Sequence, residues 1–320
     1  MSDSGMNHKS QTPIEAVLSG ELARGDVVLG TAGPMLGMLL ANYGNALFSD
    51  EVVAQVRGMG AHVARQLLFA QASAAGMADP PAFAGPRCDD LAERILRDPR
   101  FLGHCHALAL EYRLAVRLEA RSSIDPVLSP ALQTLIASPD GETARLAMQL
   151  LSAQARFVQQ QRRMELPLDE LPGRLFEDAL AAWRASASGT DGHAVDQADR
   201  HLREAHAAQA CRLSLLARVA ALADASDEQS LSIEHLGVAI FLSSLAAAAG
   251  QGRDLMALAT DESQVGRLAL ALRAAGAGPD RIAEQFVLIH PEIALPDAFD
   301  TLRADRAAAI LATSGRKELG

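Results

Sequence analysis

SDEVVAQVRGMGAHVARQLL, residues 49–68, has the hydrophobic pattern of an amphipathic helix. Its large apolar residues recur three and four positions apart, at Val52, Val53, Val56, Met59, Val63, Leu67 and Leu68. This period predicts an amphipathic α-helix that begins at the capping residues Ser49 and Asp50 and ends by Gly76. Similar segments, rich in Ala and Leu, recur from one end of the chain to the other, and almost no run is typical of a β-strand.

The composition favours closely packed helices in a folded protein. Of the 320 residues, 49% are hydrophobic and 21% charged, which is typical of globular chains, but only 4% are aromatic. Small side chains at helical spacing let helices approach each other closely. We therefore predict an all-α protein, an irregular helical array that is either a HEAT-like α-solenoid or a two-lobed helical bundle. The Asp-Pro and Ser-Pro-Asp turns favour an array, although no clean repeat period is visible.

Pro and Gly residues suggest where the N-terminal helices end. The first helix should span residues 13–24 and end at Gly25, and a second should span 34–41. Residues 76–87, GMADPPAFAGPR, are predicted to form a long loop because three Pro and two Gly interrupt any helical period.

A polar, flexible run, SASGTDGH at residues 186–193, is the predicted domain boundary. It separates an N-terminal helical lobe, 1–186, from a C-terminal helical lobe, 190–320. Beyond it, 195–225 is predicted to be one long helix. The run QFVLIH at 285–290 could be a strand, but its neighbours offer no partner strand, so we expect a helix there.

The charge and the cysteine content limit the classes of partner and the cellular compartment that we expect for this protein. The formal net charge of −10 repels phosphate backbones, so we expect no nucleic-acid partner. Three widely separated cysteines without a Cys-x-x-Cys pair suit a reducing compartment, and residues 1–11 lack the apolar region of a secretory signal. Residues 27–49 carry no charge and are long enough to span a bilayer, but their Asn-Tyr-Gly-Asn cluster would be costly there. We predict a cytoplasmic protein with no membrane partner.

No metal, cofactor or catalytic site is predicted. Adjacent residues of a helix point about 100° apart, so His104 and His106, two positions apart, cannot share one ion without further ligands. His201 and Glu204 could chelate an ion, but the Glu-x-x-His motifs of di-iron helical proteins are missing. The glycines of residues 30–37 lack the spacing of a phosphate loop. We therefore expect no enzymatic activity.

A surface for a protein partner is the remaining possibility. Phe157, Arg162 and Arg163 lie near the end of one predicted helix, and Trp183, the only tryptophan, lies on the next. An exposed aromatic residue beside arginines would suit partner binding. The alternative, which we favour for Trp183, is that it packs in the core between two helices.

Residues 153–172, AQARFVQQQRRMELPLDELP, and 267–276, RLALALRAAG, resemble an alphaproteobacterial all-helical family of unknown function. Members of that family are similar to HEAT-like arrays. The resemblance covers the middle and the C-terminal part of the chain, rests on helix-packing patterns, and brings no functional residues. It implies a bacterial, cytoplasmic setting.

Together these observations predict a non-enzymatic scaffold or regulatory adaptor whose helical surface binds an unknown protein partner. The alternative is a small-molecule-sensing domain, with a pocket between the lobes near residues 30–37 and 76–87. A metal enzyme or hydrolase that uses His104, His106 or His201 is a third possibility. Several predicted helices have more aliphatic surface than one neighbour covers, which would also allow a homodimer.

Overall fold

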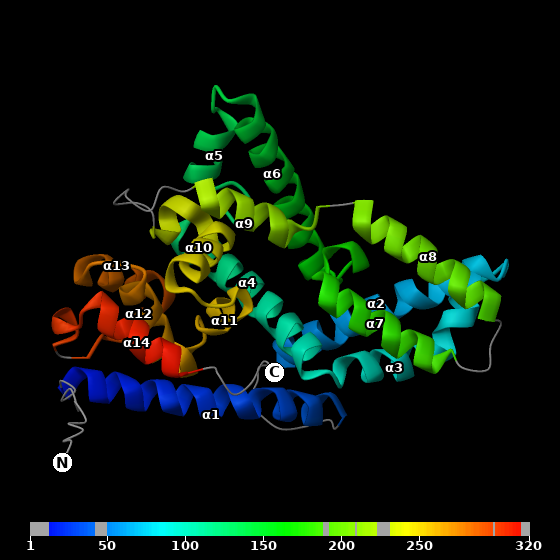
Figure 1. The fold of residues 1–320 in the computed structure, drawn as a ribbon, viewed down its shortest axis with the longest axis horizontal. Helices are drawn as coiled ribbons and strands as arrows, with labels where there is room; N and C mark the ends of the chain where they lie inside the picture. The colour runs from blue at the N-terminus through cyan, green and yellow to red at the C-terminus, as the bar shows by residue number, and fades with distance from the viewer. Residues whose placement is uncertain are drawn as a thin grey trace, which may run out of the picture.

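The computed structural model shows a helical protein (Figure 1). It describes residues 13–41, 50–187, 192–208, 210–222, 231–296 and 298–314. Every regular element in these ranges is an α-helix or a short 3-10 helix, so the all-α prediction is confirmed. None of the described helices has the length and apolar character needed to cross a membrane.

The elements follow one another with short connections. In chain order the α-helices are α1 (Pro13–Ala41), α2 (Asp50–Ala74), α3 (Pro80–Leu96), α4 (Pro99–Ser122), α5 (Pro130–Ile136), α6 (Gly141–Arg162), α7 (Gly173–Ser186), α8 (Gly192–Ala208), α9 (Arg212–Leu222), α10 (Ile233–Ala249), α11 (Arg253–Leu258), α12 (Val265–Ala274), α13 (Pro279–Ile289) and α14 (Ala304–Thr313). The 3-10 helices are η1 (Leu168–Glu170), η2 (Glu262–Gln264) and η3 (Phe299–Thr301).

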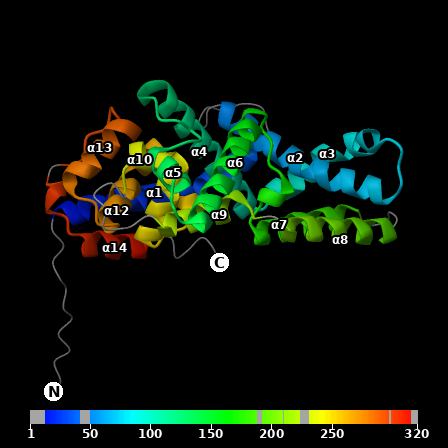
Figure 2. The ribbon, with the colours of Figure 1, turned by 90° about the horizontal axis from the view of Figure 1, so that it is seen from above.

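The helices enclose two hydrophobic cores. The larger core is built mainly from α9–α14, with α5, much of α6, the start of α1 and the second half of α4. The smaller core joins α2, α3, α7 and α8 to the first half of α4. Figures 1 and 2 show the second group of helices extending to one side of the molecule, while α1 runs along α12 and α14. Helix α4 thus contributes residues to both cores and connects them.

The two cores alternate along the chain. The buried apolar residues at 101–109 of α4, except Ala107, belong to the smaller core, and those at 114–118 belong to the larger one. Helix α8 packs on α2 although it follows the predicted lobe boundary. Part of that boundary, residues 188–191, lies outside the described residues. The division into lobes 1–186 and 190–320 stays a prediction.

Glycines allow the close helix contacts that the composition predicts. A Cβ at Gly58 of α2 would lie 2.5 Å from Met164 Cβ, and one at Gly266 of α12 would lie 2.8 Å from Glu21 Cβ. Gly25 is equally tight, because a Cβ there would lie 2.8 Å from Gln264 Oε1. The prediction that Gly25 ends the first helix is wrong. Helix α1 continues through it because the glycine admits the neighbouring Gln264 side chain.

Two further boundaries differ from the prediction. Residues 80–87 begin helix α3 instead of completing a loop. The Asp79 side chain accepts a hydrogen bond from the Ala82 N–H (3.0 Å), and Pro80 and Pro81 fall in the first turn, where proline is tolerated. The predicted long helix 195–225 is divided into α8 and α9. The break allows the Arg212 N–H to donate to the Glu170 carboxylate (2.7 Å) while the Arg212 side chain turns inward. The helix predicted at 285–290 is confirmed for 285–289, which belong to α13, and His290 is the residue at which that helix ends.

Candidate functional site

Of the four residues proposed as a partner surface, the two aromatic residues are buried and the two arginines are exposed. Trp183 is 0% exposed and its Nε1 donates to Gln71 Oε1 (2.9 Å), so the favoured core interpretation is confirmed. Phe157 is 6% exposed beneath the Arg212 guanidinium, 3.6 Å from its ring centre. Neither aromatic side chain can contact a partner. Arg162 and Arg163 are exposed at the end of α6.

The histidines that could ligate a metal lie apart. Nδ1 of the buried His104 lies 2.8 Å from Asp254 Oδ2 on α11, whereas His106 faces a cavity described below. His206 stacks on Phe176, with ring centres 4.0 Å apart, and His201 is exposed. In the part of the chain that the structure describes, no group of three His, Cys, Asp or Glu side chains is placed to hold a metal ion.

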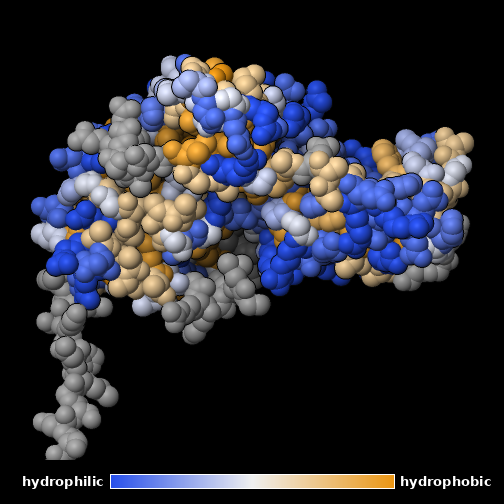
Figure 3. Space-filling model, turned by 45° about the horizontal axis from the view of Figure 1, so that its top comes forward, coloured by the Kyte–Doolittle hydropathy of each residue, from blue (hydrophilic) through white to orange (hydrophobic). Residues whose placement is uncertain are grey.

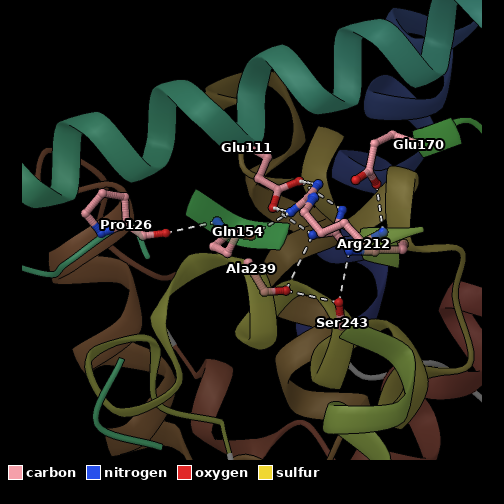
Figure 4. A network of polar contacts seen from close by, with 8 residues as sticks. Glu111, Pro126, Gln154, Glu170, Arg212, Ala239 and Ser243 are labelled. Atoms are coloured by element: carbon pink, nitrogen blue, oxygen red, sulfur yellow. Dashed lines mark hydrogen bonds and ion pairs between the residues drawn. The ribbon is translucent and has the colours of Figure 1, made fainter. Parts of the chain in front are cut away.

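A buried ion cluster joins α4, α9 and α11 (Figure 4). The Glu111 carboxylate, 1% exposed, accepts two hydrogen bonds from Arg212 (2.8 and 3.1 Å) and two from Arg253 (2.8 and 3.0 Å). Arg212 also donates to Gln154 Oε1 (3.0 Å), and Arg253 to Ser243 Oγ (2.9 Å). The cluster therefore also links α6 and α10 to α4.

The electrostatics of this ion cluster indicate a structural role. Burial alone would raise the pKa of Glu111, but the charges and hydrogen bonds of Arg212 and Arg253 outweigh it and hold the pKa well below 4.5. A carboxylate that accepts four charged hydrogen bonds has little tendency to take a proton from a substrate. We assign the cluster to holding helices together.

The candidate functional site is a cavity of about 610 Å³ between α1, α4 and the α11–η2 segment. This volume is within the range of small-molecule pockets. The start of α2 completes the wall, so the cavity lies where the larger and smaller cores meet. Its apolar lining consists of Val28, Leu29, Met35, Val52, Leu110, Leu114 and Leu258. Its polar lining consists of Thr31, His106, Arg113, Arg117, Thr260, Asp261, Glu262, Ser263 and Gln264.

Buried polar contacts hold the α1 wall of this cavity in place. Glu15 and Arg306 of α14 form a paired ion contact (both 2.9 Å), and the buried Arg267 of α12 pairs with Asp26. Gln264 Nε2 donates to the Gly25 carbonyl (2.8 Å). Because the contacts of Gly25 and Asp26 lie just before Val28, the cavity-lining turns of α1 begin from an anchored position.

The polar lining of the cavity contains both positively charged arginines and negatively charged carboxylates. Burial, and next the charge of Arg121, lower the pKa of Arg117, whereas Glu262 and Asp261 act in the opposite direction, so these groups share one electrostatic environment. Arg117 stays charged at neutral pH, as arginine does in proteins. Burial lowers the pKa of His106 to about 4, against the effect of Asp261, so its imidazole is neutral at pH 7.

Sequence reasoning located one wall of the cavity only. It named residues 30–37, part of which lies in the α1 wall, but 76–87 do not line the cavity. It missed the α4 wall, although His106, Leu110, Arg113, Leu114 and Arg117 follow the spacing of one helix face. Comparisons of the chain with known protein families, curated proteins and solved structures find no match.

Proposed function

We propose that this protein is a non-enzymatic small-molecule-binding protein whose ligand occupies the cavity between α1, α4 and the α11–η2 segment. The observation that carries the proposal is the cavity of about 610 Å³, with an apolar wall on α1, α2 and α4 and a polar wall on α4 and η2. Binding sites for small molecules combine such apolar surfaces with a few polar groups that fix the orientation of the ligand.

The hydroxyl groups of the lining support binding over catalysis. Thr31 Oγ1 donates to the Val27 carbonyl (2.9 Å), and Thr260 Oγ1 to the Ala257 carbonyl (2.7 Å). Ser263 Oγ donates to Asp261 Oδ1 (2.6 Å), which also accepts from the Ser263 N–H. A serine nucleophile instead needs a hydrogen bond to a general base that is oriented by a third group. The lining thus supports recognition of a ligand.

The scaffold or adaptor remains the second candidate, with weaker support. A partner surface is expected to show a broad apolar patch, but the face in Figure 3 shows strongly apolar residues in small, separate areas outside the grey atoms. The large exposed hydrophobic residues among those described are spread over many elements: Val17, Val27, Val28, Met77, Val116, Met148, Met164, Leu222 and Val287.

The test fills the cavity with a side chain. Leu110 is half-buried in the cavity wall, and Leu110→Trp should occupy part of its volume, whereas Leu222→Trp adds the same group to an exposed site on α9. A panel of apolar and amphipathic small molecules is screened by thermal shift, since a ligand at 100 times its Kd stabilises by about 2.7 kcal/mol.

We expect hits whose affinity falls at least about tenfold in Leu110→Trp and is unchanged in Leu222→Trp. Hits that bind both variants as tightly as the unmodified protein would contradict the cavity as their site. A panel with no hit, together with native mass spectrometry that shows no bound small molecule, would contradict the proposed function.

A further inference from the structure

The structure points to the chemical class of the ligand, an inference that rests on the proposed function. We infer that the cavity binds a zwitterion with a large apolar body, such as a dipeptide of apolar residues with both termini free. Its carboxylate would pair with Arg117, its ammonium group with Glu262 and Asp261, and its side chains would contact the apolar wall.

The first observation is that Arg117 and the carboxylates of Asp261 and Glu262 share the polar wall without pairing with one another, whereas Arg113 lies 3.9 Å from the Glu51 carboxylate. Arg117 makes one hydrogen bond, from Nη2 to the Ile289 carbonyl (3.0 Å), and the described residues place no carboxylate in ion-pair contact with it. Glu262 is exposed and accepts no hydrogen bond from any described side chain. Guanidinium donors and carboxylate acceptors are therefore both available to a ligand lying between them.

The second observation is the charge balance of the lining. Two arginines, Arg113 and Arg117, stand one helical turn apart on α4, and two carboxylates stand at the start of η2, on its N-cap Asp261 and its first residue Glu262. An anionic ligand would gain from the arginines but be repelled by the carboxylates, and a cationic ligand would meet the reverse. A ligand that carries both charges can satisfy both groups, so the lining discriminates against singly charged molecules.

The third observation is the size and character of the remaining wall. Leu110 and Leu114 of α4 and Val28 and Leu29 of α1 line the cavity of about 610 Å³. A cavity of this volume suits a drug-sized molecule and exceeds what one small polar metabolite would fill. Leucine-like side chains would bury their apolar surface here, at about 25 cal/mol for each Å² removed from water.

The experiment compares blocked and free forms of one dipeptide by isothermal titration calorimetry. The probes are leucyl-leucine, its N-acetyl form and its C-terminal amide. We expect the free dipeptide to bind most tightly, and each blocked form to bind at least about tenfold more weakly, because each has lost one charged hydrogen-bonding group.

Two variants test which side chain binds each charged end of the dipeptide. Glu262→Gln should weaken leucyl-leucine about tenfold and leave the N-acetyl form unchanged, while Arg117→Gln should remove the preference for the free carboxylate over the amide. Glu119→Gln and Arg145→Gln make the same charge changes at exposed positions that do not line the cavity, and should have no effect.

The outcomes separate this inference from the proposed function. Free and blocked dipeptides that bind equally, or a Glu262→Gln variant that keeps full affinity for leucyl-leucine, would overturn the zwitterion. Apolar probes that bind in a Leu110-dependent manner while leucyl-leucine does not bind would also overturn it, but would leave the proposed function standing. Failure of every probe would refute both.

Discussion

Replacing Glu111 by glutamine removes the carboxylate that pairs with the guanidinium groups of both Arg212 and Arg253 in the buried ion cluster. The carboxylate accepts four hydrogen bonds of 2.8–3.1 Å, and a glutamine offers one oxygen acceptor and an NH₂ group that faces cationic donors. Hydrogen bonds to charged groups contribute about 1.5–3 kcal/mol each but are not additive. Breaking a buried pair costs about 3–5 kcal/mol, so we expect the free energy of unfolding to fall by that amount.

The assay is urea unfolding followed by circular dichroism at 222 nm, repeated over a range of pH. The pKa of Glu111 lies below 4.5 in the folded protein, so its carboxylate contributes stability that is fully present above pH 4.5 and lost as pH falls through the folded pKa. The difference in stability between the unmodified protein and Glu111→Gln should therefore be constant above pH 4.5 and shrink below it.

Glu119→Gln is the matched control, because Glu119 is exposed on the same helix and should change stability by no more than about 0.5 kcal/mol. If Glu111→Gln unfolds at the same urea concentration as this control, the assignment of the ion cluster to stability is refuted. A difference that does not change with acidification would refute the argument about its ionisation.

Three further predictions follow from packing. Gly58→Ala should destabilise the protein by about 1–3 kcal/mol, because its Cβ would overlap Met164, whereas Gly85→Ala, with open space around it, should stabilise by about 0.5–1 kcal/mol; thermal unfolding of both variants checks this. Trp183 should show blue-shifted fluorescence that acrylamide quenches only after unfolding, and quenching in the native protein would contradict its burial. Cys105, 0% exposed with its thiol pKa raised by burial, should react with a thiol reagent only in denaturant.

The helices that could be recognised from the sequence are those whose signals are local. The apolar period of residues 49–68 predicts α2, and the helical prediction for 285–290 holds within α13. The start of α3 also had a local signal, Asp79 followed by two prolines, but the density of Pro and Gly after it favoured a loop. Here two local signals compete, a helix start at Asp79 and the helix-breaking Pro and Gly residues after it, and the helix start prevails.

Other errors could not have been avoided from the sequence. Gly25 lies inside α1 because Gln264, far along the chain, packs against it, and nothing near Gly25 indicates this. The break between α8 and α9 serves a contact of Arg212 with Glu111, 101 residues away. Local propensity yields to such tertiary contacts.

The candidate site shows the same division. The α4 wall of the cavity could have been recognised as one helix face, and the glycine-bearing part of α1 was singled out as a pocket region. Arg113 and Arg117 become a candidate site only because Asp261 and Glu262 are brought opposite them. A sequence pattern places residues on a face but does not say which other face it will meet.

That this protein is built from helices is visible in its sequence, because the repeat of apolar side chains and the caps that start a helix act within a few residues. The pairing of the buried charges, the glycines that serve as contact points and the position of the cavity between the helices become visible in the folded structure alone. Those features depend on the packing of segments that lie far apart in the chain, and packing is set by the shapes of both surfaces together.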